Sequence, residues 1–219
     1  VVPAGRCREA GLDRSLLSSY GHDDRVCAYA ELEALFSLDM PEKTAVCILA
    51  DKEEIGSVGI SGMQSHYFEH FMEGLCDAQG VKLSDCFANS FCLSADVSNA
   101  FDPNWPETCD KRNNSQLNYG VAICKYTGSR GKGGASDASA EAMGHVRSTL
   151  DKAGVIWQIA TLGKVDQGGG GTVAAYMANR NIVTVDAGVP VLSMHAPLEL
   201  VSKLDCYETM LACKAIYLA

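Results

Sequence analysis

Residues 44–57 read Thr-Ala-Val-Cys-Ile-Leu-Ala-Asp-Lys-Glu-Glu-Ile-Gly-Ser, and this stretch decides the fold that we expect. The apolar run of residues 45–50 is short and rich in β-forming side chains, which predicts a buried strand. It ends in a charged segment that contains the adjacent carboxylates Glu53 and Glu54. Ligands and catalytic groups of open α/β sheets gather outside the carboxyl ends of strands, so this pair marks a candidate site. The alternative is a charged loop that caps the next helix, which is the commoner role for a lone acidic pair.

Apolar spacing divides the rest of the chain into helices and strands. Helical spacing is found in residues 23–38, 60–80, 135–150, 173–177 and 198–218. Strands are expected at residues 90–95, 119–126, 155–161 and 182–186, with a loop at 98–118 and no clear periodicity in 1–22. Short strands that alternate with longer helices predict an α/β protein, a three-layer α/β/α sandwich with a mostly parallel central sheet.

The composition is that of an ordinary folded chain with an acidic balance. The 219 residues include 47% hydrophobic and 21% charged residues, and the formal net charge is −9 at pH 7. This length and the even spread of apolar segments predict a single domain over residues 1–219. A chain without a basic stripe is a poor partner for a phosphate backbone, so we expect no nucleic-acid partner.

The sequence also indicates where the protein works. No apolar stretch reaches the roughly 18 to 20 residues that cross a bilayer, and residues 1–14 lack the pattern of a signal peptide. We therefore expect no membrane partner. The ten cysteines lie mostly inside apolar runs without a CxxC pair, which is typical of buried thiols in a reducing compartment. We expect a cytoplasmic protein.

Four possible metal ligands stand at the ends of the expected elements. They are Asp23 at a helix start, Glu54 and Asp96 just after strands, and His195 before the last helix. Zinc binds imidazole nitrogen and carboxylate oxygen, so together these residues form a candidate metal site. Each of them alone has a structural interpretation as a helix cap, a turn former or a loop histidine.

Two local motifs compete with this site. His66, Glu69 and His70 fit the H-x-x-E-H pattern of inverzincin zinc proteases, although a solvated helix face would look the same. Gly128–Gly133 lacks the order of a phosphate-binding P-loop. No G-x-S-x-G motif and no cysteine with a local activating partner is present, so neither nucleophile stands out.

Six motifs, in order along the chain, resemble the aspartyl aminopeptidase family. They are PAG…GLDRS in residues 3–15, YGHDDRVCAY in 20–29, DKEEIGS in 51–57, SAD in 94–96, GKVDQGGGGT in 163–172 and DAGVPVLSMHAP in 186–197. The match covers nearly the whole chain and is far more specific than H-x-x-E-H. It implies a zinc-aminopeptidase-like fold and a co-catalytic two-metal aminopeptidase, which removes N-terminal Asp or Glu from peptides and assembles into a tetrahedral homododecamer.

The resemblance also assigns roles to individual residues. By the pattern of the family, Asp23 bridges two divalent metal ions, Glu54 and His195 complete one site, and Asp96 binds the other ion. Glu53 is implied to be the general base, because a carboxylate beside the metal can take a proton from the attacking water. The ions are usually zinc in this family, and mixed nitrogen and oxygen ligands also suit manganese or cobalt.

Three further residues are candidates for substrate binding. Lys125 matches the lysine of the family that meets the acidic side chain of the substrate, and its alternative is a strand-end lysine in solvent. Gly170 and Gly171 precede a helix, where they can let a substrate approach the backbone or offer N–H groups to a carboxylate or developing oxyanion. A plain strand-to-helix turn is the alternative for these glycines.

The chain departs from the family pattern in two places. Family members usually carry an upstream His-x-Asp motif and an inserted β-rich dimerisation domain, and the chain begins after both. We therefore expect the C-terminal portion of a catalytic domain, with one histidine fewer at the second metal. Residues 97–104 follow Asp96 where the family often has histidines, which leaves the preference for acidic N-termini open. The alternative function is a non-catalytic assembly subunit that keeps the fold.

Overall fold

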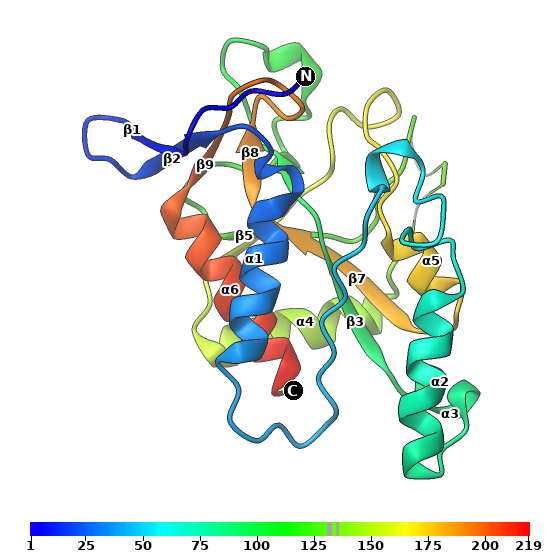
Figure 1. Ribbon diagram of the computed structural model, residues 1–219. Coiled ribbons are helices and arrows are strands. Elements are labelled where there is room, and N and C mark those ends of the chain that lie inside the picture. The colour runs from blue at the N-terminus through cyan, green and yellow to red at the C-terminus, as the bar shows by residue number, and fades with distance from the viewer. Residues whose placement is uncertain (131–132, 135) are drawn as a thin grey trace.

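The computed structural model describes residues 1–130, 133–134 and 136–219 (Figure 1). The central sheet has the strand order β3 (Phe91–Ala95), β7 (Val183–Gly188), β5 (Val121–Cys124) and β6 (Trp157–Ile159). β3 pairs with β7 and β5 with β6 in parallel, whereas β5 and β7 are antiparallel. The expected α/β class with a mostly parallel sheet is therefore confirmed, as are the four strands predicted for this sheet.

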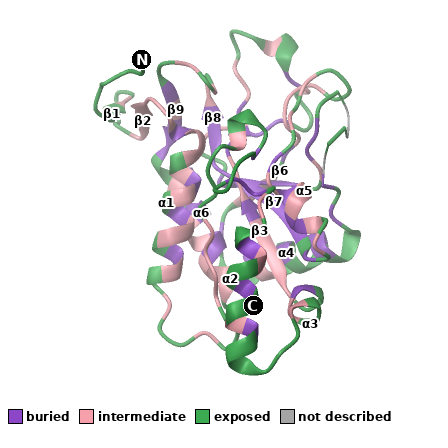
Figure 2. Cartoon of the chain, turned by 45° about the vertical axis from the view of Figure 1, so that its right-hand side comes forward, coloured by how far each residue is buried: buried purple, intermediate pink, exposed green. Residues whose placement is uncertain are grey.

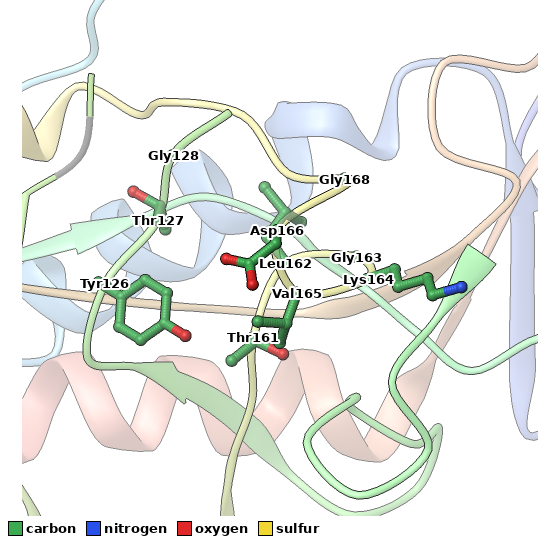
Figure 3. Close-up of a pocket in the computed structure, with 10 residues that line it drawn as sticks. All are labelled: Tyr126, Thr127, Gly128, Thr161, Leu162, Gly163, Lys164, Val165, Asp166 and Gly168. Atoms are coloured by element: carbon green, nitrogen blue, oxygen red, sulfur yellow. The ribbon is translucent and has the colours of Figure 1, made fainter. Parts of the chain in front are cut away.

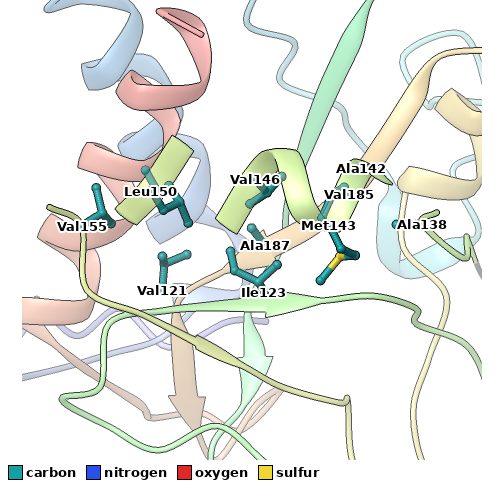
Figure 4. Close-up of a cluster of buried hydrophobic side chains, with 11 residues drawn as sticks. Val121, Ile123, Ala138, Ala142, Met143, Val146, Leu150, Val155, Val185 and Ala187 are labelled. Atoms are coloured by element: carbon teal, nitrogen blue, oxygen red, sulfur yellow. The ribbon is translucent and has the colours of Figure 1, made fainter. Parts of the chain in front are cut away.

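One face of the central sheet is covered by two helices. They are α4 (Ala140–Ala153) and α6 (Lys203–Tyr217), and α1 (His22–Phe36) packs beside α6 and also contacts β3. Val121 and Ile123 of β5 point into this layer, where they meet Val146 and Leu150 of α4 (Figure 4). All four side chains are fully buried, which is the expected result for a central strand covered on both faces.

The opposite layer is formed by three shorter helices. They are α2 (Tyr67–Gln79), α3 (Leu83–Ala88) and α5 (Ala174–Ala178). Their core contains Phe68, Met72, Phe87 and Met177, and the rings of Phe68 and Phe87 stack with centroids 5.5 Å apart. Figure 2 shows that buried residues concentrate in the sheet and on the inward faces of the helices. Within the described residues, no helix combines the length and apolar character needed to cross a membrane.

A second sheet was not predicted. Its strand order is β1 (Arg8–Ala10), β2 (Leu16–Ser19), β9 (Glu199–Ser202), β8 (Pro190–Leu192) and β4 (Ser98–Asn99). Strands of two to four residues are too short to show a period of two, so residues 1–22 and 98–118 gave no strand signal. The expected helix at 198–218 also begins later, at Lys203, because the Ser202 hydroxyl caps it by accepting a hydrogen bond from the Leu204 N–H (3.2 Å).

The prediction of a buried strand at residues 45–50 was wrong. In the described structure this segment belongs to neither sheet. Val46 and Ile48 pack against the Phe68 core, but Leu49 is 56% exposed. An apolar run signals burial on at least one side, and it does not show whether a neighbouring strand supplies hydrogen bonds.

Two further helices start later than the sequence predicted. α2 begins at Tyr67 instead of near residue 60, because the chain before it forms turns, in which the Gly62 N–H donates to the Gly59 carbonyl and the Ser65 N–H to the Gly62 carbonyl. α4 begins at Ala140, where the Ser139 hydroxyl accepts a hydrogen bond from the Ala142 N–H (3.1 Å). Gly131 and Lys132 of the glycine-rich segment, and Ala135 of the expected helix, lie outside the described residues.

Candidate metal centre

Three segments that are far apart in the sequence bring Asp23, Glu54 and His195 together. Asp23 lies in the first turn of α1, Glu54 in the 3₁₀ turn Glu53–Ile55, and His195 in the connection between β8 and β9. His195 Nε2 lies 2.9 Å from Asp23 Oδ2 and 3.3 Å from Glu54 Oε1. Each residue offers a ligand atom, and these atoms lie within 4.8 Å of one another. The spacing allows all three to bind one ion.

Asp23 also belongs to a second group of possible ligands. It joins Asp24 and Asp96, with the ligand atoms of the three carboxylates again within 4.8 Å of one another. Asp96 directly follows β3, as the sequence predicted. Asp24 was not nominated from the sequence, although it directly follows Asp23. The doubled aspartate at residues 23–24 was the available signal.

Burial and mutual repulsion raise the pKa of these carboxyl groups. Burial, followed by the charge of Glu54, raises the pKa of Asp23 to about 6. Burial and then the charge of Asp96 raise the pKa of Asp24 well above its usual value, and burial and then the charge of Asp23 do the same for Asp96. Among the described residues, Asp24 Oδ1 is buried without a hydrogen-bond partner. A divalent cation would relieve this repulsion, so the donor set fits a metal.

Glu53 lies at the edge of both groups. It precedes Glu54 in the 3₁₀ turn, and the Gly56 N–H donates to the Glu53 carbonyl (2.9 Å). Burial, followed by the charges of Glu54 and Asp23, raises the pKa of Glu53. Asp51 braces the same loop by accepting a hydrogen bond from the Ser61 hydroxyl (2.8 Å). The two adjacent glutamates therefore face a common cluster of charges.

Lys125 is already paired within the chain. It directly follows β5, and its Nζ forms an ion pair with Asp137 and donates to the Ala138 carbonyl (2.8 Å). The side chain remains 45% exposed. A substrate carboxylate would therefore share or replace the Asp137 contact.

The glycines nominated for substrate binding lie next to an open hollow. Residues 126–128 and 161–166, together with Gly168, line this hollow (Figure 3). Its Asp166 carboxylate points toward the Tyr126 side, whereas Lys164 points away. A Cβ atom at Gly171 would lie 3.0 Å from the Gly134 carbonyl oxygen, so the backbone passes close here. A Cβ atom at Gly170 would meet no described atom within 4 Å.

The H-x-x-E-H motif is held by a different interaction. Arg180 Nε donates to Glu69 Oε1 (2.6 Å), and the same guanidinium donates to the Met63 and Tyr176 carbonyls. The rings of His66 and His70 are exposed neighbours with centroids 6.4 Å apart. Among the described residues, neither cluster of possible metal ligands contains these histidines. Glu69 acts here as the partner of a half-buried arginine.

One further residue escaped the sequence analysis. Glu199 begins β9 and is only 2% exposed, and its carboxylate accepts hydrogen bonds from the backbone of both Asp23 and His195. The sequence signal was an acidic residue between two leucines, at positions 198–200, just after the His195 motif. The residue was interpreted as part of the last helix, where an acidic side chain needs no explanation.

The chain is similar to known proteins along almost its whole length. The family model of aminopeptidase I zinc metalloproteases (M18) matches residues 1–217. A relative from Clostridium acetobutylicum, named "Probable M18 family aminopeptidase 1", is 50% identical over 213 residues, which are 95% of this chain and 46% of the relative. The crystal structure of aminopeptidase I from the same organism matches with a TM-score of 0.95 and 47% identity, over 100% of this chain and 47% of that one. The chain spans about half the length of these relatives.

A more distant likeness extends to yeast. The structure of the mApe1 dodecamer from S. cerevisiae matches with a TM-score of 0.79, over 99% of this chain and 50% of that one. The two sequences are 22% identical, so this likeness shows a shared fold and nothing more.

Proposed function

Because the chain belongs to the family of aminopeptidase I zinc metalloproteases (M18), we propose that residues 1–219 form a catalytic metallopeptidase domain of an aminopeptidase. Its reaction is the hydrolysis of the N-terminal peptide bond of peptides. The membership confirms the resemblance noted in the sequence at the level of the family. The observation that carries the proposal is the position of Asp23, whose carboxylate belongs to both groups of possible metal ligands.

The proposed centre holds two divalent metal ions, for which zinc is the ion named by the family. Asp23, Glu54 and His195 hold one ion, and Asp23 together with Asp96 holds the other. Carboxylate and imidazole ligands suit zinc. Bound metal supplies a water whose pKa is lowered towards neutrality and polarises the scissile carbonyl group.

Glu53 is the proposed general base. Its carboxylate takes the proton of the attacking water and then delivers it to the nitrogen of the departing peptide. Glu53 suits this role because it adjoins the proposed ligand Glu54 without belonging to either ligand group. The two glutamates then divide the work, since Glu53 moves a proton while Glu54 holds a metal.

The finer specificity rests on Lys125 and the glycine-rich loop. We propose that Lys125 binds the side chain of an N-terminal Asp or Glu, in competition with its present partner Asp137. The close backbone approach at Gly171 supports a role for Gly170 and Gly171 in receiving the substrate. Acidic N-termini are therefore the proposed substrate class.

The proposed assembly is a homo-oligomer, as the resemblance of the sequence to the aspartyl aminopeptidase family implies. The proposed location is the cytoplasm, which is supported by ten cysteines that all remain free thiols. The second candidate function is an assembly subunit without activity. The observation that favours it is that the second group, within the described part of the chain, contains carboxylates and no imidazole.

Metal analysis combined with a substrate scan tests the proposed function. The purified full-length protein is analysed for metal content per chain, and a series of aminoacyl substrates is then assayed. Bound zinc together with hydrolysis that is fastest for Asp or Glu substrates supports the proposal. A protein that binds zinc but cleaves none of the substrates supports the assembly subunit.

A further inference from the structure

The Glu199 carboxylate joins the two segments that carry Asp23 and His195. Its Oε2 atom accepts a hydrogen bond from the Asp23 N–H (3.0 Å), and its Oε1 atom accepts one from the His195 N–H (2.8 Å). Because Glu199 is 2% exposed, solvent does not compete for these bonds. Its own backbone is fixed in the second sheet, where it pairs with Ser19 of β2. One rigid group thus sets the separation of two backbone segments.

Both segments need such a partner. Asp23 has non-helical φ and ψ at the start of α1, where N–H groups lack partners within the helix. His195 has a φ of +65°, a left-handed conformation that a residue other than glycine keeps only when its surroundings hold it. One hydrogen bond to Glu199 gives the Asp23 N–H a partner, and the other holds the His195 backbone in its left-handed conformation.

We infer that Glu199 is a positioning residue for the metal centre, which acts by holding the backbones of Asp23 and His195. This inference rests on the proposed function. It explains why Asp23 Oδ2 and His195 Nε2 lie 2.9 Å apart although their segments are far apart in the sequence. A ligand pair fixed in advance binds an ion without the cost of ordering two loops.

The chemistry of the contact requires a carboxylate. Two N–H donors need two acceptor oxygens, and a carboxylate offers both, whereas a glutamine side chain offers one oxygen and one NH₂ group. In Glu199→Gln, one backbone N–H would therefore face the amide NH₂ group. The change keeps the shape of the side chain and removes one of the two bonds.

Asp205 provides a matched control within the same chain. It is fully buried in α6, and its two carboxylate oxygens accept hydrogen bonds from the Asn118 and Gly120 N–H groups, each at 2.8 Å. Like Glu199, Asp205 accepts hydrogen bonds from two backbone N–H groups, but these groups lie just before β5. Asp205→Asn breaks an equivalent bond without touching either group of possible metal ligands.

The experiment titrates zinc into the metal-free full-length protein, with a chromophoric chelator as competitor. Glu199→Gln should weaken zinc binding about 10- to 100-fold, the usual effect of removing a group that orients metal ligands. Asp205→Asn should leave zinc affinity unchanged. Urea unfolding should show a loss of stability in both variants. Hydrolysis by Glu199→Gln should recover as zinc is raised, which a purely structural defect would not do.

Equal zinc affinity in Glu199→Gln and the parent would overturn the inference. A parent protein that binds no zinc would instead reject the proposed function, so the two failures are distinguishable. If Glu199→Gln does not fold, Glu199→Asp replaces it, because it keeps the charge but is too short to reach both N–H groups. Unchanged zinc affinity in Glu199→Asp would equally overturn the inference.

Discussion

His195 Nε2 lies 2.9 Å from Asp23 Oδ2, which joins the connection between β8 and β9 to the first turn of α1. Asp23 belongs to both groups of possible metal ligands. Among the described residues, His195 is the only histidine in either group. Without metal, the imidazole and the carboxylate lie in close polar contact beside several repelling carboxylates. We propose that both atoms become ligands when a metal ion is bound.

His195→Ala should remove one ion from the centre. Since His195 and Glu54 are proposed to complete the same site, the metal content should fall from about two to about one zinc per chain. Mass spectrometry under native conditions measures this number. The control is the double variant His66→Ala, His70→Ala, which should bind as much zinc as the parent. Loss of zinc in the double variant would favour the inverzincin interpretation instead.

Lys125→Met should change substrate preference more than overall activity. Its ammonium group is proposed to pair with an acidic N-terminal residue, and a charge-assisted bond of this kind contributes about 1.5 to 3 kcal/mol. We expect kcat/KM for Asp and Glu substrates to fall by about 10- to 100-fold relative to Ala or Leu substrates. The exposed residue Lys152 supplies the control Lys152→Met. Equal losses for acidic and neutral substrates would contradict the role of Lys125.

Glu31 should make the stability of the metal-free protein depend on pH. Burial raises the pKa of Glu31 to about 8 from its ordinary value of 4.5. Because the pKa is raised, the contribution of Glu31 to the free energy of unfolding is fully present below about pH 4.5 and is lost as the pH rises through 8. Glu31→Gln should therefore be more stable than the parent at pH 9 by several kcal/mol, since each pKa unit is worth about 1.4 kcal/mol.

Urea unfolding at pH 5 and pH 9 measures this difference. Gln keeps an oxygen that can replace the carboxyl group, so the variant should show little change at pH 5. The exposed residue Glu33, on the same helix, supplies the control Glu33→Gln. This variant should leave the pH dependence of the free energy of unfolding as in the parent. An identical pH dependence in Glu31→Gln and the parent would show that Glu31 ionises freely in the folded protein.

Arg180→Ala should lower stability and leave the metal centre intact. Its guanidinium pairs with Glu69 and donates to the carbonyls of Met63 and Tyr176, and its side chain is only 13% exposed. Removing it takes the arginine away from the Glu69 carboxylate, and because the pair is only partly buried we expect a cost of about 1.5 to 3 kcal/mol in the free energy of unfolding. Zinc content should not change. A fall in zinc content without a fall in stability would contradict the structural role of this pair.

The sequence predicted the central sheet well because its inner strands, β5 and β7, are almost entirely buried. Residues such as Val121 to Cys124 leave a continuous apolar signal of the length that such a strand needs. The second sheet left no comparable signal, since its strands are only two to four residues long. The run at 45–50 misled because apolar character reports packing, here of Val46 and Ile48, and does not report strand pairing.

The candidate site was predictable only in part. The resemblance nominated Asp23, Glu54 and His195, and the structure brings them together. Asp24 and Glu199 were missed for a physical reason. Their importance depends on partners in distant segments, such as Asp96 for Asp24, and no local pattern reveals such contacts.

Substitution of Glu53 tests the proposed mechanism most directly. Glu53→Gln in the full-length protein replaces the proposed base with an amide of the same shape, beside an unaltered Glu54. We expect turnover to fall by about 10²- to 10⁴-fold while zinc content and the unfolding transition stay at parental values, because only proton transfer is removed. Hydrolysis at the parental rate, with zinc bound, would contradict the proposed mechanism.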